Sequence, residues 1–364
     1  MQPTQVAVIG CGRIANDGHL PAYRTAAEAG LCTLVGVCDV IPERARKTAR
    51  QYGTEAFETA EDMIAETQPE AVSITTMPSS HYHLSLHALN AGCHVLCEKP
   101  VAMNLNEAEE MVQAGERAGR LLSICFEYRY WDESVYLHNR IAAGDLGPVH
   151  AVRTWGGSMY DFPTVTSFHR QASAGRGVLD HWTIHNLDLA LWLLGNPEPL
   201  TASAFCHQRL ASYPSGLGPS LNAIKPETVD PAIEDFAMGF VRVAGGTVIT
   251  VEANWLQPPS ERHEGWELFA ERGAASISPI RVWHDHGDKW IDATPPPGTL
   301  EPCDYRMERL ITGFLQAVRT GNPAPVSGAE ILRIQRLMDA LYESAAQGHE
   351  VVVGTILSSL VGRG

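Results

Sequence analysis

The sequence predicts an α/β protein built from two domains, with a largely parallel sheet in the first. The chain has 364 residues, which is more than a single common domain. Up to about residue 125, short apolar runs alternate with helical segments, as in repeated β-α-β units. Beyond that point aromatic residues and long loops become more frequent, and the strand-like runs alternate apolar with polar residues. We therefore expect a domain boundary near residue 125.

The first domain, residues 1–125, is expected to hold five strands with helices between them. Gly53, Gly92 and Gly119 stand where helices should stop, since glycine commonly ends a helix. The expected strands are 6–9, 34–37, 71–74, 94–97 and 121–124, and the expected helices are 43–52, 60–66, 81–90 and 106–118.

The second domain, residues 126–364, is expected to be of α/β type. Two strand-like runs, 236–243 and 247–255, are joined by Ala244-Gly245-Gly246 and predict an antiparallel hairpin. Residues 328–347 have the apolar stripe of an amphipathic helix, and we expect this last helix to pack back near the first domain.

The charge and the cysteines restrict the class of partner. Forty-two acidic residues against 27 basic ones give a formal net charge of −15, which opposes binding to nucleic acid and to anionic membranes. The eight cysteines include no CxxC pair, and no stretch reaches about 18 uninterrupted apolar residues. We expect a soluble cytoplasmic protein with reduced cysteines and a small-molecule substrate that is closer to neutral than strongly anionic.

A glycine-rich turn directly follows the first strand. Gly10 permits the tight turn, Gly12 lets the backbone approach a pyrophosphate, and Ala15 allows close packing of the next helix. The second strand leads to Asp39, where an acidic side chain accepts hydrogen bonds from ribose hydroxyls and repels a 2′-phosphate. We therefore expect a Rossmann domain that binds NAD rather than NADP, although Arg44 lies close by. The residues expected to bind the cofactor here are Gly10, Gly12, Arg13, Ile14 and Asp39.

The tripeptide Glu98-Lys99-Pro100 follows the strand expected at 94–97. In an open α/β sheet, ligands bind beyond the carboxyl ends of the strands. Lys99 is therefore placed to act on a substrate as well as to bind it.

These residues, together with 77–81, 91–100 and 177–195, carry a resemblance to the Gfo/Idh/MocA family of oxidoreductases, which includes glucose-fructose oxidoreductase and inositol dehydrogenases. The resemblance implies a C-terminal α/β domain on a mostly antiparallel open sheet, and a homodimer or homotetramer assembled through that sheet. It also implies that Lys99 lies beside the nicotinamide and the substrate, that Glu98 shapes the turn, and that Pro78 and His81 border the cofactor.

A second segment, residues 175–188, resembles the family's catalytic histidine motif. His185 and Asp188 match the motif, and Asp188 is expected to orient His185. Four residues before His185, where the family usually has aspartate, this chain has His181, and Asp180 stands one residue earlier. Either residue can fill the third catalytic position.

The chemistry is consistent with these roles. Oxidation of an alcohol removes a hydroxyl proton while a hydride leaves the carbon, so a base must lie within hydrogen-bond reach. We expect His185 to act as general acid/base and Lys99 to orient the hydroxyl and relay its proton. The sequence thus predicts an NAD-dependent dehydrogenase that acts on a secondary ring hydroxyl of a sugar, cyclitol or sugar derivative.

Further residues are expected to line the substrate site, although packing roles are an alternative for each. Together with the catalytic residues, the expected substrate-binding residues are Lys99, Tyr128, Arg129, Tyr160, His169, His181 and His185.

Three rival hypotheses remain open. His181 and His185 have the i, i+4 spacing of zinc ligands on a helix, but no HExxH glutamate accompanies them, so no metal is expected. An NAD-dependent glycosidase or lyase that oxidises a sugar transiently would carry the same motifs. A non-catalytic NAD-binding sensor would share the Rossmann half, but it would not need Lys99 together with His185.

Overall fold

The computed structural model describes residues 2–157, 175–208, 232–255, 264–287, 289–300 and 306–354. The chain divides into two compact units. The first consists of residues 1–131 and 302–332, and the second of residues 132–301 and 333–364. The sequence placed everything after residue 125 in the second domain, whereas residues 126–131 and 302–332 group with the first.

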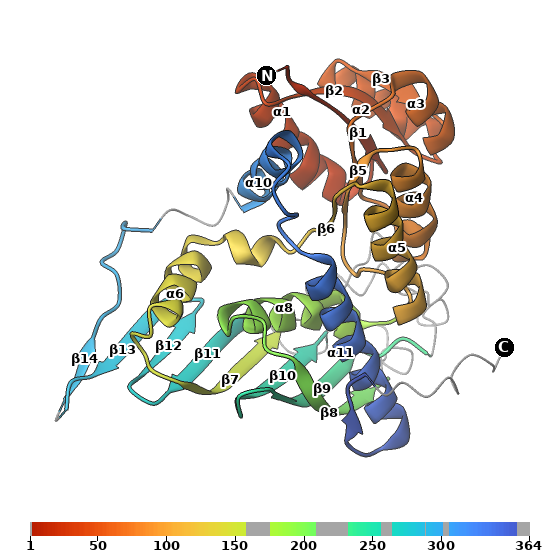
Figure 1. Cartoon of the computed structure of the whole chain (residues 1–364). Coiled ribbons are helices and arrows are strands. Elements are labelled where there is room, and N and C mark those ends of the chain that lie inside the picture. The colour runs from red at the N-terminus through yellow and green to blue at the C-terminus, as the bar shows by residue number, and fades with distance from the viewer. Residues whose placement is uncertain are drawn as a thin grey trace, which may run out of the picture. The chain divides into compact units, whose positions relative to one another are not determined.

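The first unit is built on a six-stranded parallel sheet with the strand order β3-β2-β1-β4-β5-β6 (Figure 1). The strand order reverses between β1 and β4, and such a reversal opens a crevice for a ligand at the carboxyl ends of the strands. The strands are β1 (Thr4–Ile9), β2 (Cys32–Cys38), β3 (Glu55–Phe57), β4 (Ala71–Ile74), β5 (His94–Cys97) and β6 (Leu122–Ile124).

The helices of the first unit follow the strands in alternation. They are the π-helical turn η1 (Ala15–His19), α1 (Leu20–Glu28), α2 (Pro42–Tyr52), α3 (Ala60–Thr67), α4 (Pro78–Asn90), α5 (Leu105–Ala118) and the 3₁₀ turn η2 (Glu127–Tyr130). Gly53 and Gly119 end α2 and α5 in the left-handed conformation, which confirms their predicted role as helix stops.

A helix that the sequence analysis did not identify, α10 (Arg306–Thr320), completes the core of the first unit. Leu310, Ile311 and Phe314 are buried in one cluster with Val6, Leu20 and other residues of β1 and α1. This burial explains why residues 302–332 group with the N-terminal part of the chain.

The second unit is built on a nine-stranded sheet with the order β14-β13-β12-β11-β7-β10-β9-β8-β15, which is antiparallel except for the pair β7 and β10. The predicted hairpin is confirmed as β9 paired with β10. The strands are β7 (Val149–Gly156), β8 (Pro199–His207), β9 (Phe236–Val243), β10 (Val248–Asn254), β11 (Glu264–Ala270), β12 (Gly273–Ile277), β13 (Arg281–Asp285), β14 (Trp290–Asp292) and β15 (Val351–Val352).

Helices cover one face of this sheet (Figure 1). They are α6 (Asp132–Ala142), the π-helical turn η4 (Leu179–Thr183), α8 (Ile184–Leu193) and the C-terminal part of α11 (Gly328–Gln347). Helix α11 has the bounds that the sequence predicted. The fold is therefore the predicted one, a Rossmann domain followed by an α/β domain on a mostly antiparallel sheet. In the part of the chain that the structure describes, no helix has the length and apolar character that crossing a bilayer requires.

Candidate active site

The turn after β1 has the shape that a dinucleotide requires. Gly10 has a φ of +97°, and a Cβ atom there would lie 2.8 Å from the carbonyl oxygen of Thr75, so only glycine fits. Gly12 faces open space, with no atom within 4 Å of the position of a Cβ. A pyrophosphate can therefore approach the backbone at Gly12, beside the amides that begin the next helix.

Asp39 follows the carboxyl end of β2 and is tied to this turn. One carboxylate oxygen accepts a hydrogen bond from the backbone amide of Cys11 at 2.8 Å, and the other accepts one from the amide of Ile41 at 2.8 Å. Asp39 is buried, whereas the side chains of Arg13 and Ile14 are exposed. The geometry at Gly10, Gly12 and Asp39 fits a bound NAD.

The Glu98-Lys99-Pro100 turn leaves β5 at the same edge of the sheet. Glu98 is buried, Lys99 is half-buried, and the Lys99-Pro100 peptide bond is cis. His81 supports this turn, since its Nδ1 lies 2.8 Å from the carbonyl oxygen of Pro100 and its Nε2 lies 3.2 Å from that of Thr76. Burial lowers the pKa of His81, so the ring is neutral and donates one hydrogen bond at a time.

His81 has no exposed surface, so it contacts the turn only from inside the protein, at the backbone carbonyls of Pro100 and Thr76. Pro78 is the first residue of α4, where a missing amide hydrogen is tolerated. The sequence analysis assigned Pro78 and His81 to the border of the cofactor, and this role stays a prediction.

A buried chain of polar groups lies under Glu98. The hydroxyl of Tyr23 lies 2.7 Å from that of Ser73, which lies 3.2 Å from Nδ1 of His19, and Nε2 of His19 lies 3.0 Å from a carboxylate oxygen of Glu98. Burial opposes ionisation of Glu98, but the hydrogen bond and charge of His19 outweigh it and hold the pKa of Glu98 below its ordinary value. Glu98 is therefore a carboxylate at neutral pH.

The thiol of Cys125 completes a group of His19, Glu98 and Cys125 that has the composition of a metal site. Burial raises the pKa of Cys125 well above its ordinary range, which keeps the sulfur protonated, and Sγ lies 3.7 Å from Nε2 of His19. Because each group already has a partner in the protein, we describe this cluster as a hydrogen-bonded network rather than a metal centre.

Glu127, in η2, is a second carboxyl near Lys99. Burial and the negative charge of Glu98 raise the pKa of Glu127 to about 7, against the opposing charges of Lys99 and Arg306. Neither Glu127 nor His19 was identified from the sequence. Its position in the sequence could have identified Glu127. It follows β6, which pairs with β5, and β5 is the strand that precedes Lys99.

Tyr128 and Arg129, expected in the substrate site, have packing partners inside the first unit. The ring of Tyr128 stacks on Trp131 with 4.0 Å between centroids, and Arg129 forms a buried ion pair with Glu330 at 2.7 Å. These are packing contacts, and a substrate-binding role for either residue stays a prediction.

In the second unit, the predicted catalytic histidine lies on a helix that begins with a π-turn. His185 is buried near the start of α8, and Asp180 and His181 lie in the preceding η4. A π-turn has i→i+5 hydrogen bonding, so Asp180 lies one turn before His185 even though five residues separate them. Asp188 is buried one α-helical turn after His185.

The surroundings of Asp180 and His181 differ. Asp180 is 8% exposed and its charge acts on the guanidinium of Arg176, which also pairs with Asp339 at 2.8 Å. His181 is half-buried, with its ring 5.7 Å from that of Trp255. Asp180 is therefore compensated by an internal cation, and His181 has the more accessible side chain.

Glu234 holds the start of the helix that carries His185. Its carboxylate oxygens accept hydrogen bonds from the amide of Gly177 at 2.9 Å and from that of Leu179 at 3.1 Å. Tyr342, on α11, donates a hydrogen bond to the same carboxylate at 2.5 Å. A Cβ atom on Gly177 would lie 2.1 Å from the carbonyl oxygen of Glu234, so this close approach requires glycine.

Tyr160 and His169, which the sequence also assigned to the substrate, lie outside the described residues. No position or contact is assigned to either.

Comparison with known proteins agrees with the fold. Residues 4–126 match the family model described as "Oxidoreductase family, NAD-binding Rossmann fold", and residues 134–276 match the Gfo/Idh/MocA C-terminal domain. Among curated proteins, D-glucoside 3-dehydrogenase of Escherichia coli is 28% identical over 352 residues, which cover 96% of this chain and 97% of that protein. Inositol 2-dehydrogenase of Salmonella typhimurium is 30% identical over 193 residues, or 52% of this chain and 54% of that protein.

Solved structures share the fold over nearly the whole length. Levoglucosan dehydrogenase in complex with NADH and L-sorbose superposes with a TM-score of 0.84 at 22% identity, and 97% of this chain and 99% of that chain are covered. An oxidoreductase domain protein from Kribbella flavida superposes with a TM-score of 0.85 at 21% identity, and 97% of this chain and 100% of that chain are covered. The chain is thus an oxidoreductase with an NAD-binding Rossmann domain, and it belongs to the Gfo/Idh/MocA family.

Proposed function

We propose that this protein is an NAD-dependent dehydrogenase that oxidises a secondary ring hydroxyl of a sugar, cyclitol or sugar derivative, with Lys99 and His185 handling the proton. The observation that carries the proposal is Lys99 at the carboxyl end of β5, next to the buried carboxylate of Glu98 and at the same sheet edge as the glycine turn. The nearly full-length similarity to a D-glucoside 3-dehydrogenase supports a sugar substrate.

Each residue has a defined role in this proposal. Gly10, Gly12 and Asp39 hold NAD, which accepts a hydride from the substrate carbon when it is bound. Lys99 orients the hydroxyl and takes up or relays its proton. His185 acts as general acid/base, and Asp188 orients it.

For the third catalytic position we propose His181 rather than Asp180. Asp180 is 8% exposed and its charge acts on the guanidinium of Arg176, so its carboxylate is less accessible to a substrate. His181 has the more exposed side chain and lies beside the ring of Trp255, a surface of the kind on which sugar rings stack.

We propose NAD as the preferred cofactor. Asp39 directly follows β2 and carries a carboxylate, which would repel the 2′-phosphate of NADP, and the next side chain, Val40, is apolar and exposed. Arg44 is exposed on α2 and is the nearest cation in the sequence that would favour NADP.

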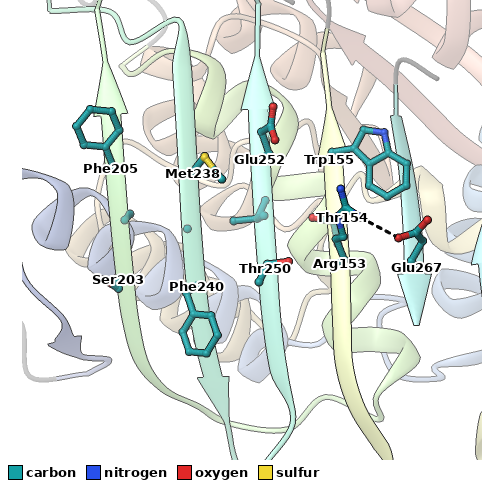
Figure 2. A pocket seen from close by; sticks show the side chains of 13 residues that line it. Arg153, Thr154, Trp155, Ser203, Phe205, Met238, Phe240, Thr250, Glu252 and Glu267 are labelled. Atoms are coloured by element: carbon teal, nitrogen blue, oxygen red, sulfur yellow. Dashed lines mark hydrogen bonds and ion pairs between the residues drawn. The ribbon is translucent and has the colours of Figure 1, made fainter. Parts of the chain in front are cut away.

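We further propose a homodimer or homotetramer assembled through the nine-stranded sheet. Figure 2 shows the face of this sheet opposite the helices, where apolar side chains stand on adjacent strands. Phe205 is 58% exposed and Met238 is 49% exposed, and such a patch on a sheet favours association with a second copy.

The seven described cysteines form no disulfide, which supports a reducing, cytoplasmic location.

A substrate screen tests the function. Monosaccharides, inositols, anhydrosugars and glycosides are incubated with NAD or NADP, and reduced cofactor and released aglycone are followed together. We expect NADH to accumulate with at least one free sugar or cyclitol, at a higher rate than NADPH. Release of aglycone without net NADH would instead establish a glycosidase or lyase.

Two variants test the catalytic residues. We expect Lys99→Ala and His185→Ala each to lower kcat/KM by about 100-fold or more, because each removes a group that handles the proton. Lys47→Ala and His83→Ala, which alter exposed residues of α2 and α4, are the matched controls and should leave kcat/KM unchanged. Unchanged turnover in both active-site variants would refute the assignment.

A further inference from the structure

Glu127 and Lys99 lie at the same edge of the first sheet on neighbouring strands. Strands β5 and β6 are parallel, with Cys97 opposite Ile124, and the amide of Cys125 donates a hydrogen bond to the carbonyl of Cys97 at 2.8 Å. Lys99 follows Cys97 by two residues, and Glu127 follows Ile124 by three. The register therefore places the two side chains next to each other beyond the strand ends.

Charged and titratable groups from three elements act on Glu127. Glu98 and Lys99 face it from the turn after β5, Arg306 from the start of α10, and the thiol of Cys125 from the end of β6. Glu98 is held as a carboxylate by His19, so a fixed negative charge lies beside Glu127. Together with burial, this charge raises the pKa of Glu127 to about 7, where a carboxyl can both accept and release a proton at neutral pH.

We propose that Glu127 is the proton acceptor for Lys99, a positioning role in the proposed dehydrogenase reaction on which this inference rests. The O–H bond of the substrate hydroxyl breaks and an N–H bond forms on Lys99, while the electron pair of the C–H bond leaves as the hydride. In the same step another N–H bond of the Lys99 ammonium breaks and an O–H bond forms on the Glu127 carboxylate, so Lys99 keeps its charge. Glu127 is half-buried and passes the proton to water, which restores both groups.

The pH profile of the reaction tests this role. We expect Glu127→Gln to lower kcat by about tenfold to a hundredfold and to remove an ionisation near pH 7 from the profile of kcat/KM. Glu127→Asp should retain that ionisation, and Glu116→Gln, an exposed position on α5, should behave as the wild type. KM and the affinity for NADH, measured by fluorescence, should stay within about twofold. A pH profile of kcat/KM for Glu127→Gln that superposes on that of the wild type would overturn the proposal.

A second measurement needs neither substrate nor cofactor. The carboxylic acid C=O stretch of Glu127 is followed by infrared spectroscopy against pH and assigned by its absence in Glu127→Gln. Lys99→Met removes the cation that favours the carboxylate, so Glu127 should bind its proton about tenfold more tightly. No change in Lys99→Met would overturn the pairing, even in a protein that folds with Glu127 intact. If the wild type turns over no sugar or cyclitol, the dehydrogenase proposal fails while this titration still decides the pairing.

Discussion

At the scale of single residues, two carboxyls beside one lysine have opposite environments. Glu98 accepts a hydrogen bond from His19 and stays ionised, whereas Glu127 lies in the field of Glu98 and holds its proton up to neutral pH. Groups whose environments push their pKa values apart can serve as acid and base in one site. The arrangement gives Lys99 a fixed negative neighbour and a titrating one.

The raised pKa of Glu127 predicts a measurable effect on stability. The folded protein binds this proton more tightly than the unfolded chain, so the free energy of unfolding falls as the pH rises from about 4.5 to about 7 and levels off above that. Glu127→Gln lacks this loss. We therefore expect the variant to gain about 1–3 kcal/mol over the wild type across this range, the lower figure allowing for solvent around a half-buried group.

Urea unfolding at a series of pH values measures this difference. Glu116→Gln removes an exposed carboxyl of α5, and its free energy of unfolding should differ from that of the wild type by the same amount at every pH. If the difference in the free energy of unfolding between Glu127→Gln and the wild type also stays constant with pH, Glu127 does not titrate in this range.

At the scale of elements, both candidate sites contain a π-helical turn. Turn η1 lies between the glycine turn and α1 and ends at His19, and η4 lies between Gly177 and α8 and contains Asp180 and His181. A π-turn adds one residue to a helical turn and thereby rotates the side chains that follow it. Each turn thus changes the direction in which the side chains of the following helix point.

Glu234 caps η4 by accepting hydrogen bonds from the amides of Gly177 and Leu179, and this cap leads to a prediction about stability and activity. Its carboxylate only accepts hydrogen bonds, and the amide of Gly177 lies 2.9 Å from both of its oxygens. In Glu234→Gln an NH₂ group replaces one acceptor at a buried position, so we expect a loss of about 1–3 kcal/mol in the free energy of unfolding. We also expect kcat to fall, because the helix that carries His185 begins at this cap. Chemical denaturation and steady-state kinetics measure both effects.

Glu271→Gln is the matched control, since Glu271 is exposed in the same unit and should cost less than about 0.5 kcal/mol. Equal stability of Glu234→Gln and Glu271→Gln would show that the cap contributes nothing.

The sequence predicted those elements whose signal is local. The strands 71–74, 94–97 and 236–243 and the helix 328–347 have their predicted bounds, because apolar runs, helical periodicity and flanking turn residues suffice to define them. The π-turns were not predicted, since i→i+5 hydrogen bonding leaves no residue pattern. The helix 306–320 was missed as well, and its apolar residues are buried against β1 and α1, about 300 residues earlier in the chain.

The same distinction applies to the site residues. Gly10, Asp39 and Lys99 were predicted because each belongs to a motif at a strand end. His19 meets Glu98 across 79 residues, and Glu234 meets Gly177 across 57, so these partners depend on the tertiary fold. Their roles became visible only from distances and burial.

At the scale of the whole molecule, each unit is assembled from two separate stretches of the chain. Residues 302–332 return to the first unit, and residues 333–364 return to the second. Helix α11 passes from one unit to the other without interruption. The chain therefore crosses between the units three times, after residues 131, 301 and 332, which is why a boundary placed at residue 125 described only the first crossing.

The uncovered face of the nine-stranded sheet leads to a prediction about assembly. Phe205, Met238, Phe240 and Trp155 stand on this face together with the ion pair of Arg153 and Glu267 at 3.4 Å (Figure 2). We expect the wild type to sediment as a dimer or tetramer at micromolar concentration. The double variant with Phe205→Glu and Met238→Glu should sediment as a monomer, because like charges would face each other across a sheet-to-sheet contact.

Val135→Glu is the matched control, since Val135 is 37% exposed on α6, the helix-covered side of the same sheet. It should leave the assembly intact. A stable interface usually buries roughly 800 Å² on each partner, so two buried carboxylates at its centre cost far more than one at a helix surface. If the double variant remains a dimer or tetramer, the copies associate through another surface. A wild type that sediments as a monomer would remove the assembly proposal altogether.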